Sequence, residues 1–352
     1  MRVVAVSKDG CWAESRKTCY VEVGTELRIA RAKETDDGAG LEAKVGRLPA
    51  REIPIALALG DELIVTRSAL PGRNAVLDER GHVLTPATVS CTADQAIDDA
   101  RTGDHIWFDD GKVGGVVERR HRDRLHVRVT RVSARGARLR TEKGMNLPDT
   151  VLNLPAITEK DRTDLRFVCQ HADMVALSFV NSVEDVRELR AILEPLGEAQ
   201  PAIVLKIETR RGFESLPAML LEAMKSPRCA VMIARGDLAV ECGFERMAEV
   251  QEEILWVCEA AHVPVIWATQ VPETLAKEGM PSRAEVTDAA MANRAECVML
   301  NKGPYILQAV NVLDDILRRM HGHQSKKRSM LRELRLVSSF REARTASAVN
   351  PT

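Results

Sequence analysis

The second half of the chain alternates short apolar runs with longer amphipathic stretches, and this alternation limits the possible fold more than any other feature. Runs of almost wholly apolar residues are typical of strands that are covered on both faces. They stand at residues 174–180, 203–208, 230–234, 263–268 and 297–300. Stretches with helical periodicity lie between them, among them 183–196 and 246–261. Strands that alternate with helices predict parallel βα units, arranged as a doubly wound sheet or as a barrel.

The first part of the chain follows a different pattern. Short β-type runs broken by Gly, Asp and Pro stand at residues 20–23, 63–66, 105–108 and 125–129, and they predict a small β-barrel or sandwich. We therefore expect four regions. These are an unassigned segment at 1–19, a β-rich domain at 20–148, a βα domain at 149–320, and a basic, flexible tail at 321–352 that begins with one short helix.

The composition excludes some classes of protein. The 51 acidic and 50 basic residues nearly cancel, so the chain as a whole has no excess charge for binding nucleic acid or an anionic membrane. The arginine-rich stretch 118–131 lacks interleaved aromatic residues, which favours solvated faces of a hairpin over RNA binding. The eight cysteines form no CxxC pair, and no apolar run suits a signal peptide or a membrane span. We expect a cytoplasmic protein.

Polar residues follow the predicted strands at the ends where parallel α/β folds gather reactive groups. Because side chains alternate between the two faces of a strand, Lys206 and Glu208 lie on the same face. There they form either part of a binding site or a structural ion pair. The next strand ends in Arg235-Gly236-Asp237, which offers backbone N–H groups to an anion and a carboxylate to a metal, unless Asp237 is only a helix cap. Thr269 ends the following strand. Together these groups suit a divalent cation, a phosphoryl group and a developing enolate.

At these residues the sequence resembles the pyruvate kinase family. The resemblance covers roughly residues 20–320 and is most specific after Lys143. It is carried by Asp109-Asp110-Gly111, Lys143-Gly-Met-Asn146-Leu-Pro148, Val204-Leu-Lys206-Ile-Glu208, Met232-Ile-Ala-Arg235-Gly236-Asp237, Pro264-Val-Ile-Trp-Ala-Thr269-Gln270 and Ser282-Arg-Ala-Glu285-Val-Thr-Asp288. The family implies a (β/α)8 TIM barrel with an inserted small β-barrel lid. Here the fold would be partial, with about five βα units.

The resemblance implies a role for each matching residue of the barrel. Glu208 and Asp237 would hold Mg²⁺ or Mn²⁺ between the substrate and the transferring phosphoryl group. Lys206 would neutralise charge on that phosphoryl group and on the enolate oxygen. Backbone N–H groups around Arg235, Gly236 and Asp237 would bind the substrate carboxylate. Thr269 would lie near the carbon that is protonated when enolpyruvate becomes pyruvate.

Two residues of the β-rich domain are implied in nucleotide binding. Asp110 and Lys143 would come from the lid, which closes over ADP or ATP and excludes water. K⁺ is a possible second cation, although no residue of this chain matches the ligands that hold it in the family. The expected function is phosphoryl transfer from phosphoenolpyruvate to ADP, giving pyruvate and ATP. A metal-dependent keto-acid lyase or aldolase, and an inactive homologue that acts as a binding protein, are the alternatives.

The chain departs from the family pattern at both ends of the barrel. Three family strands that precede the lid, together with the phosphate-binding arginine, cannot be assigned, and five strands cannot close an eight-stranded barrel. We expect a start codon placed too late in a longer gene; otherwise a partner chain or a second copy completes the barrel, or the chain refolds. Asn301-Lys302-Gly303-Pro304 replaces a family loop, and Arg210-Arg211 is basic where the family has a polar-acidic pair. No counterpart of the family's C-terminal domain is seen, so sugar-phosphate regulation is not expected.

Overall fold

The computed structural model describes residues 2–7, 10–14, 24–29, 41–46, 52–67 and 71–324. The chain divides into two compact units, Met1–Ile53 and Pro54–Thr352. In the first unit, β1 (Arg2–Ser7) pairs antiparallel with β2 (Gly10–Glu14), and β3 (Glu26–Ile29) pairs antiparallel with β4 (Leu41–Lys44). The strand predicted at 20–23 and most of the predicted tail, from residue 325, lie outside the described residues.

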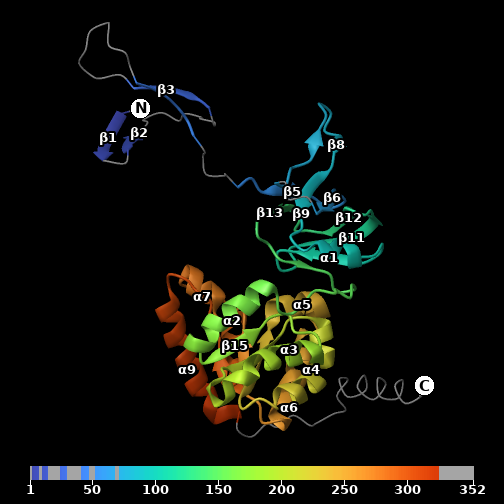
Figure 1. Cartoon of the computed structure of the whole chain (residues 1–352), viewed down its shortest axis with the longest axis vertical. Coiled ribbons are helices and arrows are strands. Elements are labelled where there is room, and N and C mark those ends of the chain that lie inside the picture. The colour runs from blue at the N-terminus through green and yellow to red at the C-terminus, as the bar shows by residue number, and fades with distance from the viewer. Residues whose placement is uncertain are drawn as a thin grey trace. The chain divides into compact units, whose positions relative to one another are not determined.

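The β-rich part of the second unit is built on one six-stranded sheet (Figure 1). Its order is β14 (Met145–Asn146), β10 (His105–Phe108), β11 (Val113–Arg120), β12 (Arg124–Arg131), β6 (Glu62–Thr66) and β9 (Ala87–Ser90). Two small pairs accompany it, β5 (Ile55–Leu57) with β13 (Ala137–Leu139) and β7 (Val76–Leu77) with β8 (Val83–Thr85). The strands predicted at 63–66, 105–108 and 125–129 are confirmed. Closure of this part into a small barrel stays a prediction.

A core explains why this sheet forms. In β12 every second side chain, Leu125, Val127 and Val129, is at most 1% exposed, as expected of a strand with one buried face. The short helix α1 (Asp94–Asp99) adds Ala96 and Ile97 to the same apolar cluster. The β-rich part therefore has its own hydrophobic core.

The second part of this unit contains five parallel strands in strictly sequential order. They are β15 (Met174–Leu177), β16 (Ala202–Ile207), β17 (Cys229–Ala234), β18 (Val265–Ala268) and β19 (Cys297–Val298). A doubly wound sheet reverses its strand order at a switch point, whereas this order runs in one direction, as in a barrel. The architecture is thus an α/β fold with a curled half-barrel sheet, and all five predicted strands are confirmed.

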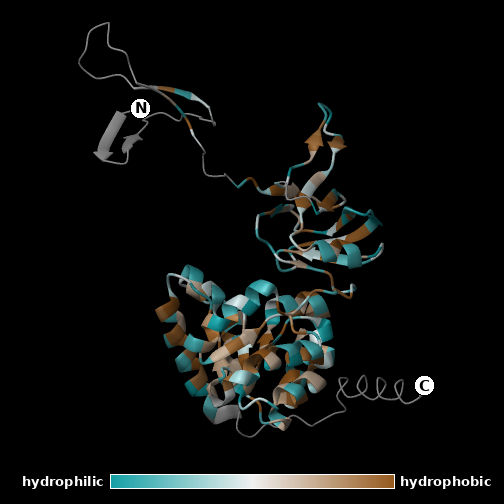
Figure 2. Cartoon of the chain, in the orientation of Figure 1, coloured by the Kyte–Doolittle hydropathy of each residue, from teal (hydrophilic) through white to brown (hydrophobic). Residues whose placement is uncertain are grey.

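Helices connect and cover the strands. They are α2 (Glu159–His171), α3 (Val183–Leu193) extended by η1 (Glu194–Ala199), α4 (Arg210–Ala223), α5 (Arg235–Cys242), η2 (Phe244–Arg246), α6 (Met247–Ala260), α7 (Glu273–Glu278), α8 (Arg283–Met291), η3 (Ala292–Arg294) and α9 (Ile306–Gln324). Thr158, Ser182 and Ser282 begin α2, α3 and α8 with capping boxes, which satisfy N–H groups that lack partners within the helix. Figure 2 shows apolar residues on the strands that these helices surround.

The two faces of the half-barrel sheet differ. Ile203, Leu205 and Ile207 belong to the apolar core that the helices cover, so Val204 and Lys206 point to the opposite, inner face. By the strand register, Met174 and Cys297 point to the inner face as well. Met174 is 58% exposed and Cys297 is exposed. The inner face at the two edge strands is therefore open to solvent.

Candidate active site

Lys206 and Glu208 lie together where β16 ends. Lys206 Nζ is 3.0 Å from Glu208 Oε1 and donates a hydrogen bond of 2.8 Å to Ser178 Oγ. Glu208 is 4% exposed, and its second oxygen accepts a hydrogen bond of 2.5 Å from the Phe179 N–H. The shared face predicted by period two is confirmed. Sequence reasoning missed Ser178 and Phe179, although both directly follow β15 and thus stand at the same edge of the sheet.

Arg235, Gly236 and Asp237 form the first turn of α5, directly after β17. The Arg235 side chain reaches toward β18 and α8, because its Nε donates to the Ala268 carbonyl at 2.9 Å, its Nη2 donates to the Thr269 carbonyl, and its guanidinium pairs with Asp288. The same guanidinium stacks over the Trp267 ring, 4.8 Å from its centroid. The side chain of Arg235 therefore fastens α5 to β18 and α8.

Thr269 lies at the end of β18 in a left-handed backbone conformation, with a φ of 63°, and Gln270 follows with a φ of 55°. Such a φ is unfavourable for a β-branched residue. It directs the Thr269 hydroxyl toward α5, where Thr269 Oγ1 accepts a hydrogen bond of 2.9 Å from the Gly236 N–H. The structure thus brings Thr269 to the predicted anion-binding turn.

The Asp237 carboxyl lies in a strongly charged environment. Burial raises its pKa, and the negative charge of Asp110 raises it further, while the Asn146 hydrogen bond and the charge of Lys206 lower it. Burial also raises the pKa of Glu241, one helical turn later on α5. A cation placed against these carboxyls would stabilise their ionised forms.

Two turns of the β-rich part carry the predicted nucleotide residues. Asp110 lies between Asp109 and Gly111, and all three have a positive φ. Lys143 Nζ pairs with Asp109 Oδ1 at 3.1 Å, so the lysine contacts the aspartate that precedes the predicted one. A cavity of about 250 Å³ borders Asp109 and Lys112. Gly111 approaches α5, because a Cβ built on it would lie 3.2 Å from Val240 Cγ2.

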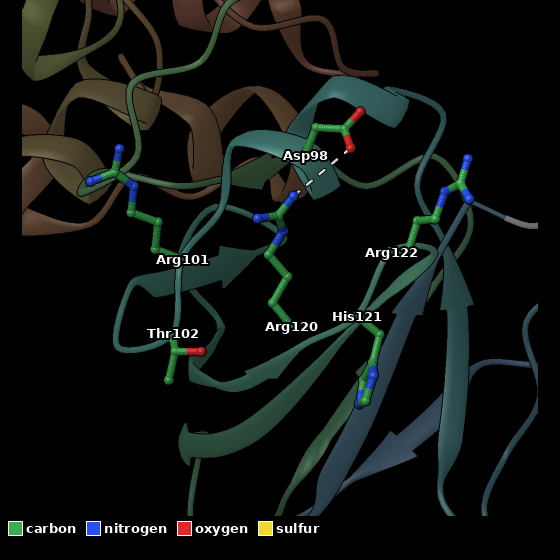
Figure 3. Close-up of a pocket in the computed structure, with 6 residues that line it drawn as sticks. All are labelled: Asp98, Arg101, Thr102, Arg120, His121 and Arg122. Atoms are coloured by element: carbon green, nitrogen blue, oxygen red, sulfur yellow. Dashed lines mark ion pairs between the residues drawn. The ribbon is translucent and has the colours of Figure 1, made fainter.

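A second cavity, of about 500 Å³, lies elsewhere on the β-rich part. It is lined by Asp98, Arg101, Thr102, Arg120, His121 and Arg122 (Figure 3), with Arg120 Nη2 4.0 Å from Asp98 Oδ1. All six side chains are exposed, and none is a predicted site residue. The predicted site residues therefore do not line this cavity.

The chemistry of the carboxylates bears on the predicted metal. Within residues 71–324 and the shorter described stretches, His, Cys, Asp and Glu form no group of three or more that could hold a metal ion. Mg²⁺ commonly takes only one or two carboxylates and completes its octahedron with water and substrate oxygens. The Glu208 carboxylate directly follows β16, and the Asp237 carboxylate lies in the first turn of α5 after the neighbouring strand β17, so the two acids match the number of carboxylates in that donor set. No helix in the described part of the chain has the length and apolar character needed to cross a membrane.

Comparison with known proteins identifies the family. The family model described as "Pyruvate kinase, barrel domain" matches residues 24–310. The chain is 35% identical to a pyruvate kinase of Bacillus licheniformis over 291 residues, covering 81% of this chain and 46% of the relative. It is 33% identical to a pyruvate kinase of Dictyostelium discoideum over 290 residues, covering 80% and 53%.

A solved structure agrees with these relatives. The crystal structure of a pyruvate kinase from Cryptosporidium parvum matches with a TM-score of 0.64 and 27% identity, covering 78% of this chain and 54% of that one. The chain spans about half the length of the relatives that it matches. Since the family model covers most of its residues, the chain belongs to the pyruvate kinase family.

Proposed function

We propose that this protein transfers the phosphoryl group of phosphoenolpyruvate to ADP, giving pyruvate and ATP, in the cytoplasm. The observation that carries the proposal is the group formed by Lys206, Glu208 and Asp237. Lys206 contacts Glu208 at 3.0 Å, and its charge also lowers the pKa of Asp237, which lies in the first turn of α5 after the neighbouring strand. An ammonium group beside two carboxylates suits a reaction in which anionic substrates, a metal and an enolate meet.

Glu208 and Asp237 would hold Mg²⁺ or Mn²⁺, which supplies positive charge that neutralises the substrate oxygens. Lys206 would stabilise the charge on the transferring group and on the enolate oxygen. An oxygen of the ADP β-phosphate attacks phosphorus while the bond from phosphorus to the enol oxygen breaks, and the enolate carbon then takes a proton. No residue is proposed for K⁺.

The other predicted residues would bind the substrates and keep water out of the site. The Gly236 N–H donates to Thr269 Oγ1, so a substrate carboxylate would take over this donor and free the Thr269 hydroxyl to face the substrate. Asp110 and Lys143 would contact the nucleotide from the lid, beside the hollow at Asp109. Closure of such a lid keeps water from hydrolysing the phosphoryl donor.

A coupled assay of pyruvate formation tests the proposal. The purified chain is supplied with phosphoenolpyruvate, ADP, Mg²⁺ and K⁺, beside the Asp237→Ala variant and the control Asp173→Ala, an exposed aspartate that precedes β15. Turnover that Asp237→Ala abolishes and Asp173→Ala retains is the expected result. Pyruvate release from oxaloacetate without ADP would favour the lyase alternative, and a folded chain without turnover would favour the inactive binding homologue.

We also propose that a second copy of the chain associates at the open edge of the half-barrel and completes the barrel. Met174 is 58% exposed on edge strand β15, and an uncovered edge of an apolar parallel sheet favours association. The net charge of −1 opposes self-association only weakly. Light scattering should give a mass of at least two chains, and a monomer at micromolar concentration would refute this part.

A further inference from the structure

Asn146 is one of four buried polar or charged residues in the described part of the chain, with 6% exposure. It lies on β14 of the lid, where the antiparallel pairing of Trp107 with Asn146 fixes its backbone. Its side chain points to the half-barrel. Asn146 Nδ2 lies 3.4 Å from Asp237 Oδ1 and 3.4 Å from Glu241 Oε1. The amide of a lid residue thus stands between two carboxylates of α5.

The contact of one amide with two carboxylates has an electrostatic reason. Asp237 and Glu241 stand four residues apart on one helix, where two like charges repel each other. An amide NH₂ has two donors, so Asn146 can serve both carboxylates at once. A cationic side chain in its place would neutralise them and compete with a metal. An amide holds their orientation and leaves their charge available.

Asn146 is itself held from the half-barrel side. The Arg210 guanidinium donates a hydrogen bond of 2.7 Å to the Pro148 carbonyl and lies 3.7 Å from Asp149, two and three residues after Asn146. The main-chain N–H of Arg210 donates to the Glu241 carboxylate. Arg210 therefore fastens the connection from the lid to the same carboxylate that Asn146 contacts. Arg210 thus has a structural role at a position where a basic residue departs from the family pattern.

We propose that Asn146 is a positioning residue of the metal site, a lid amide that orients the Asp237 carboxylate toward a divalent cation, with Arg210 holding the lid connection in register. The inference rests on the proposed function, because it takes Glu208 and Asp237 as the metal ligands. It adds that the affinity for the metal depends on the lid as well as on the half-barrel.

Direct binding of Mn²⁺ to the purified 352-residue chain, followed by electron paramagnetic resonance without substrates, tests the inference. Loss of a group that orients a metal ligand typically weakens affinity 10- to 100-fold, so Asn146→Ala should raise the Kd for Mn²⁺ about tenfold or more. The matched control is Asn153→Ala, which removes an amide hydrogen bond of 3.1 Å to Asp99 and should leave the Kd unchanged.

Arg210→Met provides a second variant in case Asn146→Ala does not fold, as judged by circular dichroism. It keeps the main-chain donor to Glu241 and loses the contact with the Pro148 carbonyl, and it should weaken Mn²⁺ binding by a smaller factor. Mn²⁺ binding that persists at full affinity in folded Asn146→Ala, or in Arg210→Met when Asn146→Ala is unfolded, overturns the inference alone. Absence of Mn²⁺ binding by the unaltered chain overturns the metal assignment and the inference together.

Discussion

Replacing Glu253 by Met should stabilise the protein. Glu253 lies on α6 between Val250 and Ile254, is 1% exposed, and neither of its carboxylate oxygens has a hydrogen-bond partner among the described residues. An unsatisfied buried polar group costs about 1–3 kcal/mol. Met has a similar shape and helix propensity, so the substitution removes this cost without leaving a large cavity. We expect the free energy of unfolding to rise by about 1–3 kcal/mol.

The measurement is a thermal melt followed by circular dichroism, with urea titration as a second probe. For a folded unit of this size, a gain of 1–3 kcal/mol corresponds to a rise in Tm of roughly 2–6 °C. Glu259→Met is the control on the same helix, since Glu259 is exposed and its replacement should leave Tm unchanged. A fall in Tm for Glu253→Met would show that the carboxylate makes a stabilising contact and would refute the reasoning.

The remaining predictions concern pH and cysteine reactivity. Hydrogen bonds from Lys225 and Arg190 hold the pKa of Glu222 below its usual range against the effect of burial. A lowered carboxyl pKa stabilises the folded state above the pKa of the unfolded chain and stops doing so as the pH falls through the folded-state pKa. The Glu222→Gln variant should therefore unfold at lower urea than the parent at pH 7, and the gap should close on acidification below about pH 4.5; an equal gap at both pH values would contradict this. Burial raises the pKa of Cys258 to about 12, so iodoacetamide at pH 8 should alkylate the exposed Cys297 and leave Cys258 unmodified, as peptide mass mapping can check. Early labelling of Cys258 would show that α6 opens readily.

The sequence predicted the strands of the half-barrel well because their signal is local. A run such as residues 203–208 is apolar except for Lys206 and Glu208 at its end, and such a run is typical of a strand in a parallel sheet that helices cover. The shared face of Lys206 and Glu208 follows from the two-residue period of a strand, and both side chains do meet. The face to which the Lys206 and Glu208 side chains point could therefore be predicted without knowing which distant residues lie near them.

Contacts between distant residues could not be predicted in the same way. Asn146 and Asp237 stand 91 positions apart, and nothing local to either residue indicates that one lies against the other. The Arg235 side chain reaches β18 because a carbonyl 33 residues later accepts its hydrogen bond and Trp267 offers a ring to stack on. The pairing of Lys143 with Asp109, and not with Asp110, depends on the fold of two turns.

The left-handed backbone of Thr269 has a consequence for how this position can change over evolutionary time. A non-glycine residue held in this conformation costs on the order of 1–3 kcal/mol, and a β-branched residue is among the least suited to it. Gly would relieve the strain but would remove the hydroxyl that meets the Gly236 N–H. Selection for folding stability alone would therefore favour Gly or Asn at this position, and any benefit of the threonine hydroxyl has to exceed the cost of the strained backbone.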